Sequence, residues 1–424
     1  MSRRLLPLLA ALALGGCAPT DPDHLDFALA DSWPAAPALP PMGSGLIVVT
    51  NSMDDTVSLL SLDTLGTPEW GELAKLPVGL NPVELEGPHH AAFSPRGDFY
   101  YVGLSLSVAG AGSGPHGAHG TGTADGYALK LDAATHRLVG STRVDRNPGD
   151  LVLSADGRTL YQTHFELKKI EEGNKAGGTS AERYKAMTAT LAIIDADTMK
   201  LRKKVPVCPA PHAVRLSLDE TRAFIACISD EVAVVRLDDP TYPVTRVALP
   251  GANPEPDKAA LTPRYSPYAL TSSPTDGGVW VSTLNTSTVW YVDPTTLQVV
   301  PERSLTLTGF EDEDLRRGIP MFGAVSADGR TLYMPFQRVD TVAIIDVSGP
   351  KPVVRGRIPL ADEGCLNVHQ VELTPDGRHA LAVCEGDHVG PGTVHALELG
   401  TGRVMKTVRV GLYPDSVGIL RRKP

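Results

Sequence analysis

The 424-residue chain has little of several features that identify common protein classes. Only 5% of its residues are aromatic. Positive charge is scarce, with 39 Lys and Arg against 49 Asp and Glu and a net charge of −10, and this balance excludes a protein that binds the phosphate backbone of nucleic acids. After residue 14 no apolar run approaches the roughly 18 residues that a membrane-spanning helix needs.

Several catalytic motifs are missing as well. The sequence contains no Cys-x-x-Cys-His for covalent haem attachment and no Gly-x-Ser-x-Gly nucleophile elbow. It also lacks a Gly-rich phosphate-binding loop. These absences remove the c-type haem proteins, the α/β-hydrolases and the P-loop nucleotide hydrolases from consideration.

Glycine and proline are abundant, with 41 and 36 residues, and they are unsuited to long helices. A chain of this length would ordinarily form two or three domains of roughly 150 residues each. The exceptions are repeat architectures and large all-β bodies, which remain one domain. The pattern of the sequence decides between these cases.

The N-terminus is similar to a bacterial lipoprotein signal. Arg3 and Arg4 precede an apolar run at residues 5–14 that is too short to span a bilayer, and Gly15, Gly16 and Cys17 follow. The resemblance implies a signal peptide over 1–16, a lipidated Cys17 with a Pro/Ala-rich tether over 17–44, and a body over 45–424. An ordinary secretory signal is the alternative. Ala18 after the cysteine resembles lipoproteins sent to the outer membrane, so we expect the lipid anchor to lie in the outer membrane of the bacterial envelope, with the body facing the periplasm or the cell exterior.

The body repeats one phrase six times: an apolar stretch ending in Ser or Thr, a turn such as Ala-Asp-Gly-Arg, and a second apolar stretch. Asp and Gly adopt the conformations, including positive φ, that reverse a chain within a few residues, so each phrase predicts a β-hairpin. Subtracting their first positions gives spacings of 48 to 63 residues, the scale of propeller blades. The phrases lie at 93–103, 153–163, 216–226, 272–282, 325–335 and 373–383.

The segments after the hairpins complete each predicted blade. An alternating apolar run such as 341–346 predicts a third strand, and a short fourth strand such as 351–358 follows it. The chain opens near residue 46 without a first strand and ends near residue 420 with a first strand that has no sequel. We therefore expect an all-β, seven-bladed β-propeller of four-stranded antiparallel blades, closed by three N-terminal strands plus one C-terminal strand.

The segment SADGRTLYMPFQRVDTVAIIDV at 326–347 resembles the YVTN repeat family of seven-bladed propellers, whose units read approximately SPDGRTLYVANxxxNTVSVID. The resemblance covers residues 45–420 and implies the fold. It implies no single function, because the family is similar to the nitrous oxide reductase propeller, to 6-phosphogluconolactonase-like lactonases and to secreted surface proteins. The Val-Ala-Asn end of the second strand is mostly replaced here, by QTH, ACI, MPF and VCE.

One position in each predicted blade points to a functional site. The connection into the innermost strand and the connection from the second to the third strand lie on the same face of a propeller, so their residues meet at one mouth of the central channel. Three of seven equivalent residues in the first connection are histidines. The seven are His89, Gly149, His212, Tyr268, Met321, His369 and Asp415.

Further histidines are expected on the same face, namely His164, His388, and His116 and His119 of the loop at 107–126. Imidazole clusters commonly hold Zn or Cu. We expect a metal site formed by His89, His212 and His369, with His90 or Met321 nearby; the soft thioether of Met321 would favour copper over zinc. The alternative is a polar channel mouth without a metal, to which Asp150, Tyr268 and Asp415 also belong.

Four cysteines repeat a pattern around two of these histidines. Cys208 and Cys365 each stand four residues before a ring histidine, and Cys227 and Cys384 each follow 19 residues later. In an exported protein this arrangement predicts two intrablade disulfides, Cys208–Cys227 and Cys365–Cys384. Metal ligation by the four thiolates is the alternative.

Two functions stay open, and the sequence identifies no catalytic residue. The first is a non-catalytic, monomeric, lipid-anchored scaffold whose channel-mouth face binds a protein or small-molecule ligand. The second is a metal-binding propeller, with copper favoured over zinc, in a redox, metal-handling or lactonase-like hydrolytic role. The segment 164–187 has helical propensity and charges of both signs, which indicates a cap or a docking element on that face.

Overall fold

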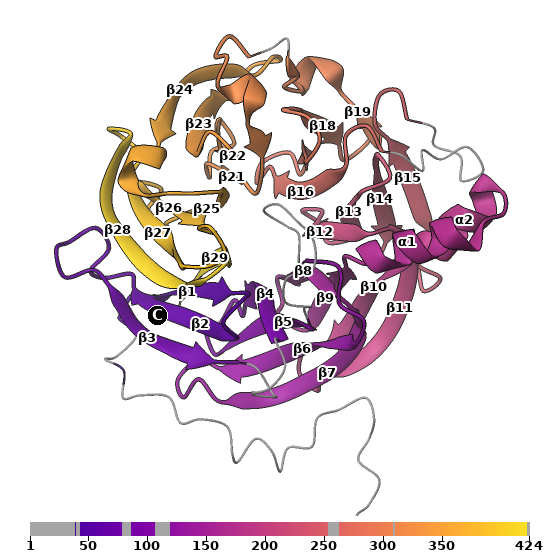
Figure 1. The fold of residues 1–424 in the computed structure, drawn as a ribbon, viewed down its shortest axis with the longest axis horizontal. Helices are drawn as coiled ribbons and strands as arrows, with labels where there is room; N and C mark the ends of the chain where they lie inside the picture. The colour runs from indigo at the N-terminus through magenta and orange to yellow at the C-terminus, as the bar shows by residue number, and fades with distance from the viewer. Residues whose placement is uncertain are drawn as a thin grey trace, which may run out of the picture.

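Short strands separated by tight turns make up most of the computed structural model, which describes residues 39, 43–78, 86–106, 119–252, 263–307 and 310–421. Within these residues the strands form seven antiparallel sheets arranged around a central axis (Figure 1). The predicted seven-bladed propeller is therefore confirmed. The predicted signal peptide, nearly all of the tether, Cys17 and His116 lie outside the described residues.

The ring closes as the sequence predicts. The C-terminal strand β29 (Pro414–Leu420) is the innermost strand of a sheet whose other members are β1 (Leu46–Asn51), β2 (Thr56–Ser61) and β3 (Glu72–Pro77). Leu46 is paired with Ser61 on one side and with Leu420 on the other. Hydrogen bonds between the two ends of the chain thus leave no open blade in the described ring.

The other six sheets follow in chain order, each with its innermost strand first. They are β4 (Glu86–Phe93), β5 (Phe99–Leu106), β6 (Asp125–Asp132) and β7 (Leu138–Arg146); β8 (Pro148–Leu153), β9 (Thr159–His164), β10 (Thr188–Asp195) and β11 (Lys200–Pro209); β12 (Pro211–Leu216), β13 (Arg222–Cys227), β14 (Glu231–Arg236) and β15 (Val244–Ala248); β16 (Pro267–Ser272), β17 (Val279–Thr283), β18 (Val289–Asp293) and β19 (Gln298–Val299); β20 (Ile319–Pro320), β21 (Ala324–Val325), β22 (Thr331–Gln337), β23 (Thr341–Asp346) and β24 (Val353–Pro359); and β25 (Val368–Leu373), β26 (His379–Cys384), β27 (Pro391–Glu398) and β28 (Arg403–Leu412).

The core lies between the sheets. Alternate side chains of a strand face opposite sides, so a strand with two apolar faces can pack against both neighbouring blades. In β1, Ile47 and Val49 pack toward the β25–β28 sheet, while Val48 packs toward the β4–β7 sheet. The described residues form seven such apolar clusters, matching the seven interfaces between adjacent sheets.

The hairpin turns have the predicted chemistry. Gly157 in the Ala-Asp-Gly-Arg turn between β8 and β9 has a φ of 76°, a conformation that glycine adopts without steric cost. In the variant turn between β12 and β13, Glu220 takes the same region at φ 55°. The turn geometry therefore persists where the glycine is replaced.

The β20–β24 blade departs from the predicted pattern, because its inner strand is split into β20 and β21. Between them, Phe322 leaves the sheet and forms a parallel bridge with Gln370 of the next blade. Its amide donates to the carbonyl of His369 at 3.0 Å, and its own carbonyl accepts from the amide of Val371 at 2.9 Å. The buried phenyl ring consequently lies among the channel histidines.

The segment with predicted helical propensity forms α1 (Leu167–Ala176) and α2 (Ser180–Met187), which project at the rim in Figure 1. Thr179 and Glu182 form a capping box that begins α2. From the middle of α2, the Tyr184 hydroxyl donates to Glu231 of β14 at 2.7 Å. In the part of the chain that the structure describes, no helix is long and apolar enough to cross a membrane.

Both predicted disulfides are present, Cys208–Cys227 and Cys365–Cys384. The first is not intrablade as predicted, since Cys208 lies in β11 of one sheet and Cys227 ends β13 of the next. The reason is that β11 extends to Pro209, so the predicted loop is still part of the outer strand. This bond therefore joins two neighbouring blades.

Candidate functional site

The inner strands bulge where the predicted ring of residues lies. An extra residue in one strand bends it and re-aims the side chains at that point. In β4 the bulge comprises His89 and His90, and His90 has the left-handed φ of 56°. Equivalent register shifts occur in β8, β12, β16, β25 and β29, at or beside Gly149, His212, Tyr268, His369 and Asp415.

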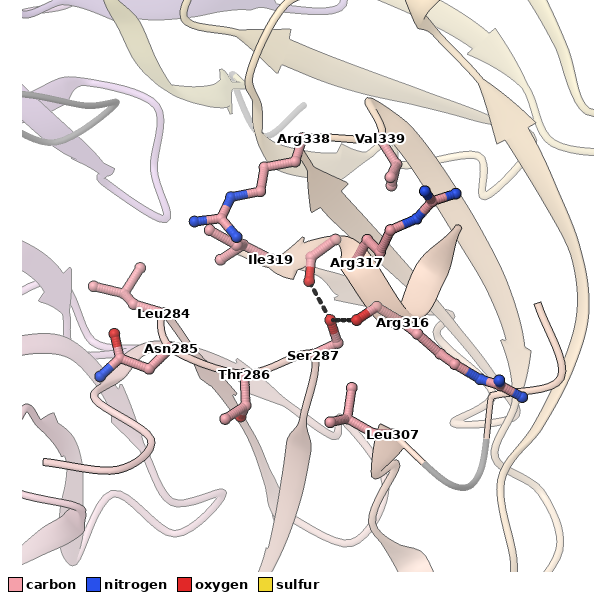
Figure 2. A pocket seen from close by; sticks show the side chains of 11 residues that line it. Leu284, Asn285, Thr286, Ser287, Leu307, Arg316, Arg317, Ile319, Arg338 and Val339 are labelled. Carbon is pink, nitrogen blue, oxygen red and sulfur yellow. Dashed lines mark hydrogen bonds between the residues drawn. The ribbon is translucent and has the colours of Figure 1, made fainter. Parts of the chain in front are cut away.

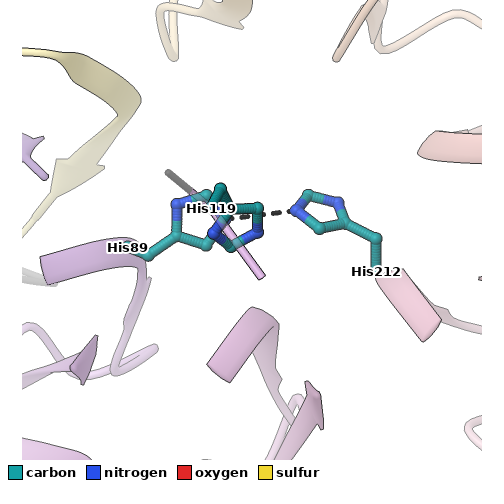
Figure 3. Close-up of side chains that lie close together, drawn as sticks. All are labelled: His89, His119 and His212. Atoms are coloured by element: carbon teal, nitrogen blue, oxygen red, sulfur yellow. Dashed lines mark hydrogen bonds between the residues drawn. The ribbon is translucent and has the colours of Figure 1, made fainter. Parts of the chain in front are cut away.

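Three histidines from separate parts of the chain converge at this channel mouth (Figure 3). His89 comes from β4, His212 from β12, and His119 from the connection between β5 and β6. Each offers one nitrogen such that the three atoms lie within 4.8 Å of one another. The Nε2 atoms of His89 and His212 are 3.1 Å apart.

The membership of this cluster corrects one detail of the predicted site. We expected His369 to join His89 and His212, but the third member of the group is His119. The Nδ1 atom of His369 is hydrogen-bonded to the backbone carbonyl of Asp415, and this bond turns its Nε2 atom toward Glu385, at 3.8 Å. His119 is held over the cluster by stacking on Phe165, with ring centroids 4.9 Å apart.

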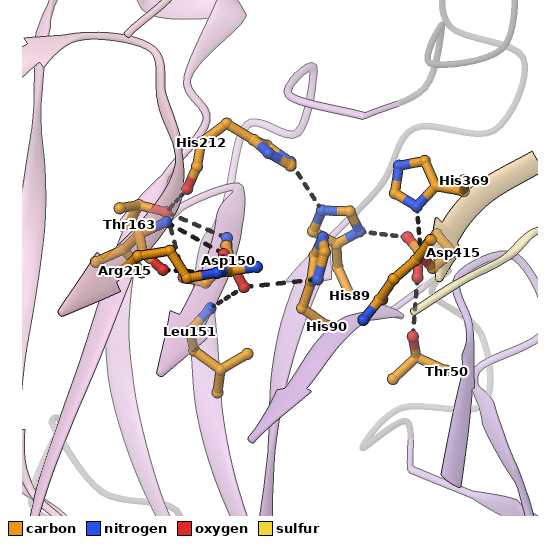
Figure 4. A network of polar contacts seen from close by, with 12 residues as sticks. Thr50, His89, His90, Asp150, Leu151, Thr163, His212, Arg215, His369 and Asp415 are labelled. Carbon is orange, nitrogen blue, oxygen red and sulfur yellow. Dashed lines mark hydrogen bonds and ion pairs between the residues drawn. The ribbon is translucent and has the colours of Figure 1, made fainter. Parts of the chain in front are cut away.

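Hydrogen bonds at the far nitrogens orient two of the rings, and Figure 4 shows the one between His89 and Asp415. The Nδ1 atom of His89 contacts the carboxylate of Asp415, which also accepts hydroxyl hydrogen bonds from Thr50 at 2.8 Å and Ser52 at 2.6 Å. The Nδ1 atom of His212 lies 3.1 Å from the carbonyl of Tyr268, and the two rings stack at 3.6 Å. Both Nε2 atoms are thereby directed toward each other.

The pKa shifts favour a neutral His212 and a charged Asp415. Burial, followed by the neighbouring His119 and His89, lowers the pKa of His212 well below its usual value. Burial alone would raise the pKa of Asp415, but His89, His369 and Ser52 together lower it. Neutral imidazole with a carboxylate behind it is the form in which histidine binds metals.

His90 belongs to a second polar group beside the first. Its Nδ1 atom is 3.6 Å from Oδ1 of Asp150, and the other oxygen of that carboxylate is paired with Arg215 (Figure 4). The Nε2 atom of His90 is buried, and no described residue forms a hydrogen bond with it. Asp150, which the sequence offered as a channel-mouth acid, is thus committed to an ion pair with Arg215.

A third group lies on the other side of the channel. The Glu385 carboxylate accepts from Nε2 of Gln337 at 2.8 Å and contacts Nε2 of His388 at 3.0 Å. Burial, with Asp415 nearby, raises the pKa of Glu385 well above its ordinary value. His388 therefore joins the channel groups through Glu385, which is not among the residues predicted from the sequence. Glu385 directly follows β26, the second strand of its blade, as Phe165 directly follows β9, and this position is the signal that could have identified Glu385.

Two further predicted residues, Met321 and His164, have contacts of their own. Met321 belongs to the apolar cluster that also includes Tyr268 and Phe322, and its carbonyl accepts from Ser282 at 2.9 Å. The Nδ1 atom of His164 is 2.9 Å from the carbonyl of Thr190, on the side of the blade that carries Asp145.

Near the second disulfide, His395 lies close to the sulfurs of Cys365 and Cys384. Because those two sulfurs are bonded to each other, they offer no thiolates to a metal.

The geometry of the cluster can be compared with metal coordination. Two imidazole nitrogens bound to one tetrahedral zinc at about 2.0–2.1 Å lie about 3.3 Å apart. The 3.1 Å separation of the His89 and His212 Nε2 atoms is close to that value. A cavity of about 10 Å³ adjoins the cluster, lined in part by His89, His119 and Tyr413, and this is room for about one ion or water.

Comparisons with known proteins support the propeller fold and identify no function. No protein-family model and no curated protein matches the chain. A solved structure of a putative 6-phosphogluconolactonase from Bacteroides uniformis is 17% identical, with a TM-score of 0.61 over 89% of this chain and 99% of that one.

Two other solved structures are similarly distant. A periplasmic gluconolactonase from Pseudomonas aeruginosa is 16% identical, with a TM-score of 0.59 over 89% of this chain and 99% of that one. A functionally unknown protein from Desulfotomaculum acetoxidans is 11% identical, with a TM-score of 0.62 over 90% of this chain and 100% of that one. At these identities the likeness shows the fold alone: the chain shares the β-propeller architecture of 6-phosphogluconolactonase-like proteins.

Proposed function

We propose that the protein binds one zinc or copper ion at His89, His119 and His212 and uses it to hydrolyse a small ester such as a lactone. The observation that carries the proposal is the convergence of three buried imidazoles with ligand atoms within 4.8 Å of one another. Histidine is the commonest protein ligand for such ions.

The surroundings of the three rings favour a metal site over a group of polar side chains that binds no metal. Asp415 and the Tyr268 carbonyl occupy the Nδ1 side of two rings, an arrangement that fixes the tautomer and directs Nε2 at an ion. In the structure the Nε2 atoms of His89 and His212 are hydrogen-bonded to each other at 3.1 Å, and an ion between the rings would replace that one bond. An ion at their centre would be bound by all three rings at once.

The donor set also bears on the choice of metal and reaction. Met321, whose thioether would favour copper, packs in an apolar cluster, and three imidazoles by themselves suit zinc as well as copper. Three protein ligands leave a fourth position for water or substrate, and a bound ion lowers the pKa of water and polarises a carbonyl. Two of the solved structures with this fold have lactonase names, which directs the choice of substrate.

The test of metal binding is elemental analysis of tag-free protein, before and after reconstitution. We expect about one equivalent of zinc or copper, and a loss of most of it in His212→Ala. His379→Ala is the matched control, since His379 lies at the start of β26 beside Asp376, away from the channel. Wild-type protein that takes up less than a tenth of an equivalent would overturn the proposal.

The test of the reaction is hydrolysis of gluconolactone by reconstituted and chelator-treated protein. Because spontaneous hydrolysis is appreciable, the informative quantity is the difference between wild type and His212→Ala at the same protein concentration. We expect the excess rate to disappear on chelation and return with the metal. An excess rate unaffected by chelation would contradict metal-dependent hydrolysis while leaving metal binding intact.

We propose further that the protein is exported and lipid-anchored in the bacterial envelope. The two disulfides support this, because they persist in oxidising compartments and are rare in the cytosol. Cys17→Ser should shift the protein from the membrane to the soluble fraction. The binding-scaffold role and the docking role of α1 and α2 stay predictions; capture of a partner that α1 truncation abolishes would support them.

A further inference from the structure

A second site lies on the loops between the β16–β19 and β20–β24 sheets. There the structure has a cavity of about 660 Å³, bordered by the connection between β17 and β18, the segment preceding β20, and the turn after β22 (Figure 2). Pockets of about 300–1,000 Å³ hold small organic ligands. This cavity is far larger than the space beside the histidine cluster, so it can accept a whole small molecule.

Three arginines give the cavity its character. Arg316, Arg317 and Arg338 line it, and no Asp or Glu is among the described residues that do so. The chain as a whole has a net charge of −10, so the charge of this cavity is opposite in sign to that of the protein. A pocket of one charge sign concentrates ligands of the opposite sign.

The three arginines differ in how far they are already engaged. Nε of Arg316 donates to the carbonyl of Phe310 at 2.7 Å, and Nη2 of Arg317 donates to Asp314 at 2.8 Å. For Arg338, by contrast, no hydrogen bond or ion pair joins its guanidinium to the described part of the chain. Its five N–H donors are therefore available to a ligand.

The backbone around Arg338 is held in an unusual shape. Arg338 has a φ of 70°, in the left-handed region that side chains other than glycine seldom adopt. Its neighbours fix this turn from both sides: Gln337 donates to Glu385 at 2.8 Å, and Asp340 accepts from the amide of Val368 at 2.8 Å. Figure 2 shows the Arg338 side chain extending across the opening toward Leu284. Sixteen described residues other than glycine have a positive φ, so this conformation belongs to the turns of the propeller, and at Arg338 it sets the direction in which the side chain leaves the backbone.

The rest of the wall is mixed. Leu284 and Ile319 provide apolar surface, and Asn285 adds a side-chain amide whose nitrogen is already bonded to Ser266 at 2.8 Å. That hydrogen bond leaves the amide oxygen as an acceptor for hydroxyl groups. The arginines of the wall can therefore bind an acidic group of a ligand. The apolar and hydrogen-bonding side chains can contact its carbon skeleton and hydroxyl groups.

We propose that this cavity binds a small organic anion, a hydroxylated compound carrying one carboxylate or phosphate group, with Arg338 as its main contact. The planar guanidinium fork matches both groups bidentately. The inference goes beyond the metal-dependent function and does not require it, since none of the three proposed metal ligands borders the cavity.

The experiment is calorimetric titration of the full chain with D-gluconate, D-glucose 6-phosphate and neutral D-glucose. At least one anion should bind about tenfold or more tightly than glucose, and its affinity should fall as salt rises. Binding of gluconate assigns the carboxylate class, and binding of the sugar phosphate assigns the phosphate class. Arg338→Gln should weaken the bound anion about tenfold or more.

Two controls make the result specific. Arg378→Gln removes an arginine of which 78% of the side chain is exposed, in the turn before β26, and should leave affinity unchanged. Chelator treatment should also leave it unchanged. The proposal is overturned if neither anion binds better than glucose, if Arg338→Gln binds as wild type does, or if chelation abolishes binding, which would place the anion at the histidine cluster instead.

Discussion

Asp415→Asn is the substitution that best separates a built metal site from an accidental cluster of histidines. Asp415 does not contact the proposed ion, but its carboxylate faces Nδ1 of His89 and accepts from Thr50 and Ser52. Asparagine keeps the size of the side chain and one oxygen, but it removes the charge and replaces the second oxygen by a donor. At least one of the three donors must then lose its acceptor.

The expected effect can be estimated from these contacts. Loss of a carboxylate behind a ligating histidine costs about 10- to 100-fold in metal affinity. At about 1.4 kcal/mol per factor of ten, that is about 1.4–2.8 kcal/mol of binding free energy. Competition with a chelating dye, at a neutral pH where both proteins are folded, measures the affinity.

Asp340→Asn is the matched control. Asp340 is also a buried carboxylate on the propeller, and it accepts from the amide of Val368 rather than from a histidine. It should lose stability without losing metal affinity. Wild-type affinity in Asp415→Asn, or an equal loss in both variants, would refute the orientation argument.

Two further predictions concern stability. Replacing Cys208 and Cys227 by serine removes a disulfide whose cysteines are 19 residues apart in the sequence. The free energy of unfolding, measured with denaturant, should fall by about 3 kcal/mol. An unchanged value would contradict a stabilising link between the two blades. Burial lowers the pKa of His395 from 6.5 to about 4, so its neutral form is favoured in the fold and stability falls as the unfolded chain takes up a proton below about pH 6.5. Between pH 7 and pH 5 the wild type should lose about 2 kcal/mol more than His395→Gln, and parallel pH profiles of the two would refute this.

Much of the fold could be predicted because it depends on local, repeated signals. The Asp-Gly turns and the alternating strands each specify a hairpin without reference to the rest of the chain. Closure followed from the missing strand at one end and the surplus strand at the other, which pair as β1 and β29. The disulfide partners were predictable for the same reason, although the extent of β11 was not.

The site was predictable only in part, because it depends on contacts between blades. The spacing placed His89 and His212 at one mouth, and their Nε2 atoms meet at 3.1 Å. The third member depended on how the connection before β6 folds over the channel and stacks His119 on Phe165. Phe322 was missed because its departure from the sheet is set by hydrogen bonds to His369 and Val371 of another blade, which no local pattern reveals.

The central claim is that one metal ion is bound by His89, His119 and His212. Anomalous diffraction from crystals of the tag-free protein, loaded with one equivalent of zinc and recorded on both sides of the zinc edge, tests it most directly. We predict a single peak within about 2.0–2.1 Å of one nitrogen from each of the three rings. A peak elsewhere, or none at the channel mouth, would contradict the account.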